Sequence, residues 1–352
     1  MANQSAAKSV RIWLIIGLVM VFVQVLLGGV TRLTGSGLSI TEWNVVMGSL
    51  PPMNANEWNE VFAKYQQFDQ FKLVNSQMNL EEFKSIFFWE WVHRLWARSM
   101  GFVFILPFIY FILKGIIAKN QIWRYSILMI LGGLAGVVGW IMVASGLKED
   151  MVLVNPVKLM LHLLVACSIF MYLFRLLLED TYPKERKRFD ASVRRLTTLL
   201  IVLVVIQISF GGLVAGSKAA LNWTTWPLMN GSFIPEHLGF HHPFSEHVPE
   251  INITLQFIHR MMAYVITIFA VFFYWRSRNT LAQSNFHVYR NLMLLVVFVQ
   301  VLLGILTVIN SKGSVPVAYG VMHQLMAFIL LNITIGLHYF VKHRAISSSS
   351  LR

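Results

Sequence analysis

The segment Glu90-Trp91-Val92-His93-Arg94 opens an apolar stretch that continues to Ile112, and this stretch decides the fold. A carboxylate and an imidazole three positions apart lie on the same face of a helix, one turn from each other. Ionisable groups inside a membrane-spanning helix are costly and are usually kept for function. The segment returns as Gln256-Phe257-Ile258-His259-Arg260, where an amide replaces the carboxylate. We therefore expect two related sites, of which only the first can move protons.

The composition is that of an integral membrane protein. The chain has 352 residues, of which 56% are hydrophobic and 13% are charged, and its mean hydropathy is +0.62. Soluble domains are about 25% charged, and a membrane-spanning helix needs about 20 mostly apolar residues. The sequence predicts an all-α fold with eight transmembrane helices rather than a closed β-barrel, whose strands would show only short alternating segments. The predicted spans lie near residues 11–30, 87–113, 123–145, 156–178, 194–216, 253–275, 290–310 and 317–341.

The net charge of +13 indicates topology rather than binding to nucleic acid, which we do not expect as a partner. Lysine and arginine crowd the ends of the spans on one side, whereas the loops on the other side hold most of the acids. The positive-inside rule then places both termini in the cytoplasm. The first span is too long for a cleaved signal peptide, and no transit peptide precedes it. We therefore expect a multi-pass protein of a bacterial inner membrane. The basic residues that crowd the ends expected to be cytoplasmic are Lys8, Arg11, Lys114, Lys119, Arg124, Lys184, Arg186, Lys187, Arg188, Arg194, Arg195, Arg276, Arg278, Arg290, Lys342 and Arg344.

The chain contains an internal duplication. Gln24, Gly28 and Gly29 at the end of the first span match residues at the end of the fifth span, each 183 positions later, as Gln207 follows Gln24. The match continues without a gap through the pairs Thr41 and Thr224, Trp43 and Trp226, Gly48 and Gly231, Ser49 and Ser232, and Pro52 and Pro235. We expect two tandem four-helix bundles, residues 1–180 and 181–352, related by a pseudo-twofold axis along the membrane normal.

The first outer loop, predicted to cover residues 31–86, is long and partly helical. Residues 55–71 are amphipathic, and Asn79 with Glu82 forms a capping-box pattern. The loop is either a lid over the outer end of the first bundle or a packing appendage. Cys167 is the single cysteine and lies within a span, so no disulfide can form within one chain.

Four histidines lie at one predicted depth, in the even-numbered spans. Each is about six residues inside the outer end of its span, or roughly 9 Å at the rise of an α-helix. They are His93 and His162 in the first half and His259 and His323 in the second. Two facing helices of a bundle can supply opposed imidazoles to one haem iron. A single such histidine is more often an interhelical hydrogen-bonding group, but four at one level favour haem.

Haem is a better fit than zinc, because a structural zinc site needs four grouped nitrogen or sulfur ligands. Arg94 and Arg260 lie next to two of the histidines and could bind haem propionates, or could simply extend to the membrane interface. Glu90 is either a solvated carboxylate at a helix start or an acid-base group beside the iron ligand. We favour the acid-base role. The loop histidines His237, His241, His242 and His247 could bind a metal such as copper, but a solvated loop explains them as well.

At this point the sequence resembles the heme A synthase family over nearly the whole chain. The resemblance rests on the glycine-rich end of the first span running into Thr31-Arg-Leu-Thr-Gly-Ser-Gly-Leu-Ser39, on Glu90-x-x-His93-Arg94, and on His162, His259-Arg260 and His323. Some members have a cysteine pair in the first outer loop, which this sequence lacks, so the resemblance is to the cysteine-free branch.

The resemblance implies a haem-dependent oxidoreductase that oxidises a ring methyl of heme O to the formyl group of heme A, for cytochrome oxidase. It implies that His259 and His323 hold a resident haem b, that His93 and His162 hold the iron of the substrate haem, and that Glu90 is the essential carboxylate. The partners it implies are heme O, an external electron donor, heme O synthase, cytochrome oxidase assembly factors and membrane lipid.

Two other functions compete with this interpretation. A diheme b-type electron-transfer protein that oxidises quinol would share the paired histidines, but transfer across the membrane favours haems on opposite sides. A transporter would explain the repeat, but it predicts unwound helices and buried charges at the midplane, and the sequence shows neither.

Overall fold

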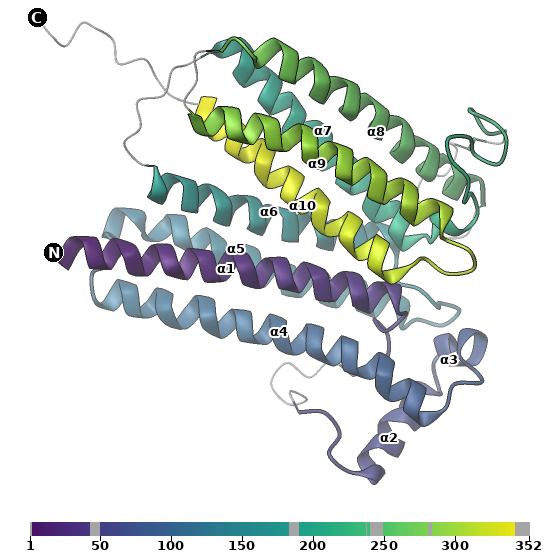
Figure 1. The fold of residues 1–352 in the computed structure, drawn as a ribbon. Helices are drawn as coiled ribbons and strands as arrows, with labels where there is room; N and C mark the ends of the chain where they lie inside the picture. Colours follow the sequence, from purple (N-terminus) through teal and green to yellow (C-terminus); the bar gives the residue numbers. More distant parts are fainter. Residues whose placement is uncertain are drawn as a thin grey trace, which may run out of the picture.

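The computed structural model describes residues 2–42, 50–182, 190–236, 238–239, 249–280 and 284–341 (Figure 1). These residues form helices and no strand. The α-helices are α1 (Ala2–Leu33), α2 (Ala55–Tyr65), α3 (Asp69–Val74), α4 (Leu80–Leu113), α5 (Ile122–Gly146), α6 (Pro156–Thr181), α7 (Ala191–Gly216), α8 (Pro249–Ser277), α9 (Ser284–Ile309) and α10 (Val317–Val341).

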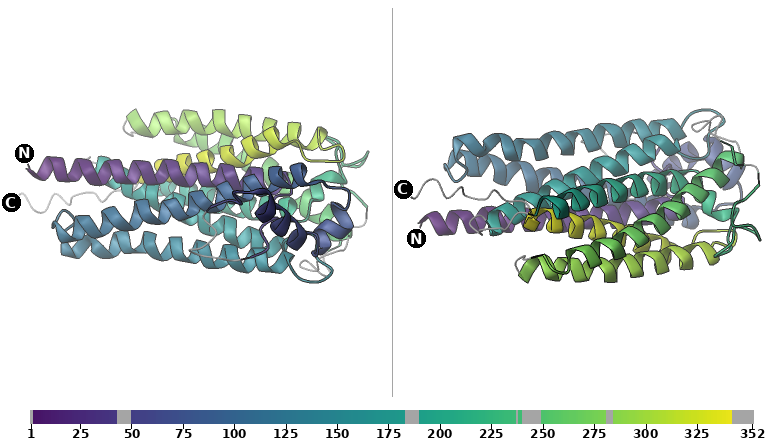
Figure 2. Two further views of the ribbon diagram at one scale, coloured as in Figure 1. Left: turned by 90° about the horizontal axis from the view of Figure 1, so that it is seen from below. Right: turned by 90° about the horizontal axis from the view of Figure 1, so that it is seen from above.

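Eight of the helices in the described part of the chain are long and apolar enough to cross a membrane. They are α1 and α4 to α10, and they lie side by side in one elongated bundle (Figure 2). Large apolar side chains such as Phe102, Leu106 and Ile268 are more than 60% exposed on its outside, as expected for surfaces that face lipid. The predicted all-α membrane fold and its eight spans are therefore confirmed.

The helix ends follow from local sequence, and α1, α4 and α9 begin several residues before the spans predicted for them. Asn79 caps α4 through a complete capping box with Glu82, so the predicted box is present. Because this cap starts the helix, α4 begins at Leu80 and not near residue 87, and His93 lies deeper along its helix than predicted. A helix of 34 residues is about 51 Å long, so the outer end of α4 extends past the roughly 30 Å hydrocarbon layer.

The helices pack in two groups. α1 packs against α4 and α6, and α5 packs against α6; in the same way α7 packs against α8 and α10, and α9 packs against α10 and α8. The groups meet where α1, α6, α7 and α10 contact one another, and Figure 1 shows α4 and α8 on opposite sides of the bundle. This packing is compatible with halves at residues 1–180 and 181–352, and their separate roles stay a prediction.

The contact between the halves is closest where α7 meets α6. A Cβ atom added at Gly216 would lie 2.7 Å from the Cα of Pro156, and one at Gly212 would lie 3.2 Å from the Cα of Met160. Any larger residue at Gly216 would force the two backbones apart. The guanidinium of Arg32 donates to the carbonyl of Ala215 over 3.1 Å, so the outer ends of α1 and α7 are also joined.

The segment predicted to be a lid or an appendage forms a small subdomain on the outer end of α4. Tyr65 of α2 stacks on Phe83 of α4 with ring centroids 5.1 Å apart, and both side chains are fully buried. Tyr65 donates to Gln70, which donates to the carbonyl of Gly35. Burial raises the pKa of the Tyr65 hydroxyl. The subdomain is therefore tied both to α4 and to the loop that follows α1.

Candidate functional site

Each of the four candidate histidines lies against a glycine of a neighbouring helix. A Cβ atom added at Gly139 or Gly304 would lie 2.9 Å from Cε1 of the facing histidine ring. At Gly211 and Gly28 the corresponding distances to the ring are 3.1 Å and 3.2 Å. A side chain at any of these positions would displace the ring, so glycine is needed for the close approach. The pairs are Gly28 with His93, Gly139 with His162, Gly211 with His259 and Gly304 with His323.

Three of the rings also contact a glutamine that precedes the facing glycine by one helical turn. The amide Nε2 of Gln24 lies 2.8 Å from Nε2 of His93. Gln207 and Gln300 approach Nε2 of their histidines to 3.4 Å. This role was not predicted from the sequence, although Gln24 and Gln207 belong to the repeat. The signal was present, because Gln-Val-Leu-Leu-Gly occurs twice, at residues 24–28 and 300–304.

The spacing of His259 and His323 fits two axial ligands of one iron. Their ring centroids lie 6.3 Å apart, and the ring planes are inclined by 79°. A bond from iron to an imidazole nitrogen is about 2 Å long, so two opposed ligands place their ring centroids roughly 6 Å apart. His323 is fixed on its other side, because its Nδ1 lies 3.0 Å from the carbonyl of Gln300, which is the bond that orients a ligating histidine. The donor set therefore fits haem.

His93 and His162 both lie in the other half, His93 against Gly28 of α1 and His162 against Gly139 of α5. Among the residues that the structure describes, no group of three or more His, Cys, Asp or Glu side chains could hold a metal ion by itself. His259 and His323 thus form one pair, and the pairing of His93 with His162 stays a prediction. His237, His241, His242 and His247, which were considered as a copper site, lie outside the described residues.

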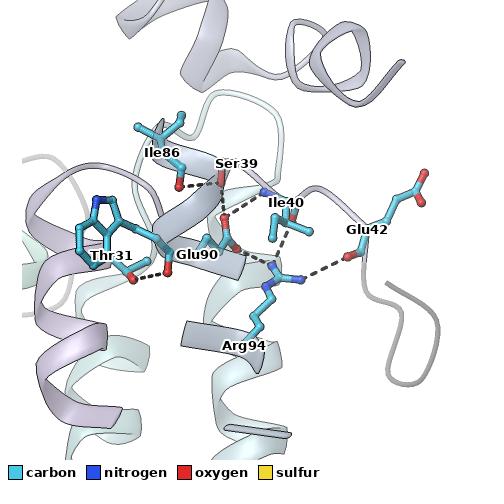
Figure 3. A network of polar contacts seen from close by, with 8 residues as sticks. Thr31, Ser39, Ile40, Glu42, Ile86, Glu90 and Arg94 are labelled. Carbon is cyan, nitrogen blue, oxygen red and sulfur yellow. Dashed lines mark hydrogen bonds and ion pairs between the residues drawn. The ribbon is translucent and has the colours of Figure 1, made fainter. Parts of the chain in front are cut away.

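Glu90 is buried and anchors the loop that follows α1 (Figure 3). Its side chain is 3% exposed. One carboxylate oxygen accepts hydrogen bonds from the hydroxyl of Ser39 over 2.7 Å and from the backbone N–H of Ile40 over 2.9 Å. The other oxygen accepts from Arg94 over 2.5 Å. Glu90 therefore is not the solvated carboxylate at a helix start that we considered as an alternative.

Arg94 binds the same loop. Besides Glu90 it donates to the carbonyl of Ile40 over 3.0 Å and to that of Glu42 over 3.3 Å. In the second half, Arg260 donates to the carbonyls of Trp223 and Thr225, each over 2.8 Å. Both guanidinium groups therefore hold the loop that follows the preceding helix. This role was not predicted, because the sequence pattern does not give the path of these loops.

Gln256 takes the place of Glu90 in the second half, but its contacts differ. Its amide donates to the carbonyl of Trp223 over 3.0 Å. Its Oε1 atom is buried without a hydrogen-bond partner among the described residues. Glu90 instead accepts three hydrogen bonds and forms an ion pair with Arg94. The predicted asymmetry between the sites is thus a difference in charge at one buried position.

Glu90 and His93 contact different elements although they share a face of α4. The carboxylate faces the segment that contains Ser39 and Ile40 (Figure 3). The imidazole lies against Gln24 and Gly28 of α1. The site therefore places a histidine near a buried carboxylate and a hydroxyl group, and iron binding by His93 and His162 stays a prediction.

The chain is similar to a described protein family and to several named proteins. Residues 11–335 match the family model described as "COX15-CtaA: Cytochrome oxidase assembly protein". The chain is 43% identical over 325 residues to a protein of Chelativorans sp. (strain BNC1) named "Heme A synthase", covering 92% of this chain and 88% of that protein. It is 39% identical over 333 residues to proteins of the same name from Brucella ovis (strain ATCC 25840 / 63/290 / NCTC 10512) and Brucella abortus (strain S19), covering 94% of this chain and 90% of each relative.

Proposed function

The chain belongs to the COX15-CtaA family of cytochrome oxidase assembly proteins, and from this premise we propose how its two histidine pairs divide the work of a heme A synthase. The enzyme oxidises a ring methyl of heme O to the formyl group of heme A. The observation that carries the assignment to this site is that one buried carboxylate, Glu90, accompanies only one of the two pairs.

We propose that His259 and His323 hold a resident haem b. The distance of 6.3 Å between their rings supports this. When bound, this haem supplies one-electron transfer between an external donor and the other half. The protein contributes the ring positions, through the glycines that face them, and the orientation of His323, through the carbonyl of Gln300.

The substrate haem belongs to the first half, where His93 and His162 are its ligands. Arg94 and Arg260 lie one residue after a ligand in each half and at the outer end of the spans, which supports a place beside the haem propionates. Their bonds to loop carbonyls keep each outer loop over its site. The loop that Arg94 holds thereby limits how far a substrate ring can extend outward.

Glu90 serves as the acid-base group in this proposal. A methyl group offers no acidic proton, so its oxidation needs an iron-activated oxidant and supplied electrons. Two successive two-electron oxidations would give first an alcohol and then a gem-diol, which loses water to leave the aldehyde. Protons must leave the ring edge in these steps. Ser39, which donates to Glu90, has a hydroxyl that can both donate and accept. We therefore place the proton path through Glu90 and Ser39.

The eight apolar helices make this a multi-pass membrane protein. We further propose a bacterial inner membrane with both termini in the cytoplasm, which the distribution of lysine and arginine supports. The external electron donor, heme O synthase and cytochrome oxidase assembly factors remain proposed partners.

The deciding experiment uses cells that express the protein together with a source of heme O. Haems are extracted and identified by chromatography and mass. We expect heme A in these cells and none in cells that express the His93→Ala variant. Heme A at the wild-type level in that variant would contradict the assignment of the first half to the substrate.

A further inference from the structure

A cavity of about 290 Å³ opens near the inner ends of the helices, between α5 and α6 of the first half and α10 of the second. One of its lining residues, Ser168, lies six positions beyond His162 on α6, and another, His338, lies fifteen positions beyond His323 on α10. At the rise of an α-helix these separations are about 9 Å and about 22 Å along the helix axes. The cavity is therefore separate from the four candidate histidines, and their proposed role does not explain it.

The wall of the cavity is chiefly hydrocarbon. Its apolar side chains come from three helices and are Leu131, Met171 and Ile335. The two hydroxyl groups that α6 contributes to the wall donate elsewhere: Ser168 donates to the carbonyl of Leu164 and Tyr172 to the carbonyl of Arg124, each over 2.9 Å. An occupant of this part of the cavity therefore gains mainly from the burial of apolar surface, as a hydrocarbon chain does.

The rim of the cavity is positively charged. Arg175 lines the cavity, and its side chain is 41% exposed. It donates to one oxygen of Glu179 over 2.7 Å, and the other oxygen of that carboxylate pairs with Arg124. Two guanidinium groups thus share one carboxylate, so one positive charge of this cluster has no counter-ion among the described residues. A guanidinium has five N–H donors, so Arg175 can bind a second anionic group besides Glu179.

The second half supplies the opposite wall of the cavity. His338 of α10 lines it, and Nδ1 of this histidine lies 3.2 Å from the hydroxyl oxygen of Thr197 on α7. The neighbouring Tyr339 donates to the carbonyl of Tyr182, the C-cap residue of α6, over 3.2 Å. The cavity therefore lies where α6 and α10 bring the two halves together, and an occupant contacts both halves at once.

The side of the membrane indicates the kind of occupant. The cavity lies at the end of the bundle where lysine and arginine gather, which is the side expected to be cytoplasmic. Basic pockets between transmembrane helices on that side bind the headgroups of anionic lipids. A phosphate group accepts paired N–H bonds from an arginine, and an acyl chain is apolar. An anionic phospholipid therefore matches both the charged rim and the apolar wall.

We propose that this cavity binds one anionic phospholipid of the inner leaflet, with its phosphate at Arg175 and part of an acyl chain against Leu131, Met171 and Ile335. The lipid joins α5 and α6 to α10, and so stabilises the contact between the halves at the end of the bundle away from the candidate histidines. This inference goes beyond the proposed function and does not depend on the assignment of either haem.

The test uses the full-length protein, purified in detergent and freed of loosely bound lipid. Native mass spectrometry counts the phospholipids bound to each molecule, and thermal unfolding is followed as phosphatidylglycerol or phosphatidylcholine with the same acyl chains is added. Arg175→Gln removes the charge at the rim. Arg278→Gln is the matched control, because Arg278 lies over the ring of Trp275 and does not line the cavity. Ser168→Leu fills the cavity, leaves the ion pairs in place and serves if Arg175→Gln fails to fold.

We expect phosphatidylglycerol to raise the unfolding temperature of the wild type and of Arg278→Gln, and phosphatidylcholine to raise it much less. Arg175→Gln should weaken the binding of phosphatidylglycerol by about tenfold, the effect of losing one hydrogen bond to a charged group. Ser168→Leu should weaken it as well, because the acyl chain loses its space. Equal binding of the two lipids by the wild type, or equal binding of phosphatidylglycerol by Arg175→Gln and Arg278→Gln, would overturn the proposal.

Two further additions separate a lipid from other occupants. Inorganic phosphate that stabilises the protein as much as phosphatidylglycerol would identify a site for a free anion, and decylubiquinone that displaces phosphatidylglycerol would identify a site for a quinone. Either result would overturn the proposal. Haem content, measured by absorbance, should be the same in all three variants as in the wild type, so the outcome for the lipid is independent of the outcome for the proposed function.

Discussion

One arginine holds the loop after α1 and another holds the loop after α7, through the same kind of contacts. The residue one helical turn before the arginine differs between the two halves. Arg94 and Arg260 each donate to two loop carbonyls. Glu90 adds an ion pair and a hydrogen bond from a hydroxyl, whereas Gln256 adds one amide donor. The second half, which has the neutral Gln256, shows that such a loop can be held without a carboxylate. The carboxylate is therefore not needed for folding alone, which is the basis for giving it a chemical role.

The largest effect is expected when one histidine of the proposed resident pair is removed. We expect His259→Ala or His323→Ala to strip the haem from the second half and to abolish heme A formation, because one imidazole remains where two are needed. Haem content per protein, measured by absorbance after purification, checks this. His287→Ala is the matched control, since His287 packs on Phe286 away from the pairs. Full haem content in the His323→Ala variant would contradict the assignment.

The second largest effect is expected from a substitution that makes the first half resemble the second. Glu90→Gln should leave the haem spectrum largely intact and reduce heme A formation by about 10²- to 10⁴-fold, the range of a lost acid-base group. Extracted haems, separated by chromatography, report the product. Gln256→Glu is the mirror control and should not raise the rate. Loss of the bound haem together with retained activity would refute both the role and the place of Glu90.

The third prediction concerns the glycines that face the histidine rings. Gly304→Ala places a methyl group 2.9 Å from the ring of His323 and should destabilise the protein by about 1–3 kcal/mol, the usual cost of overpacking, with partial loss of haem. Gly101→Ala is the control, because a Cβ there meets no atom within 4 Å. Thermal unfolding and haem content measure the two effects. Identical behaviour of both variants would show that the ring has room to move.

The smallest effect tests the hydroxyl beside Glu90. Ser39→Ala removes one of the three hydrogen bonds to the carboxylate, at a cost of about 1 kcal/mol in unfolding free energy, and should slow heme A formation severalfold if the proton path runs through it. Ser39→Thr keeps a hydroxyl and should restore most of the rate. If alanine lowers stability but not the rate of formation, Ser39 only holds the loop.

Much of this could be predicted from sequence because the signals are local. Eight apolar runs give eight spans, and the capping box at Asn79 marks a helix start. The start of α4 was still placed too late, because its first turns lie outside the apolar run and belong to the outer subdomain through Phe83. The partners of Glu90 depend on the path of the loop through Ser39, which no periodicity encodes. The contact of Gln300 with His323 was missed because only equivalent helices of the two halves were compared, whereas the segment around Gln300 on α9 matches that around Gln24 on α1.

The close approach of α7 to α6 has a consequence for electron flow. With Gly216 against the backbone of Pro156 and Gly212 against that of Met160, these two helices cannot slide past each other without a steric clash. The separation between the two proposed iron positions would then be set by the packing of α7 on α6. Tunnelling from one to the other would proceed over a fixed gap, so its rate would respond to the difference in reduction potential and not to any rocking of one half against the other.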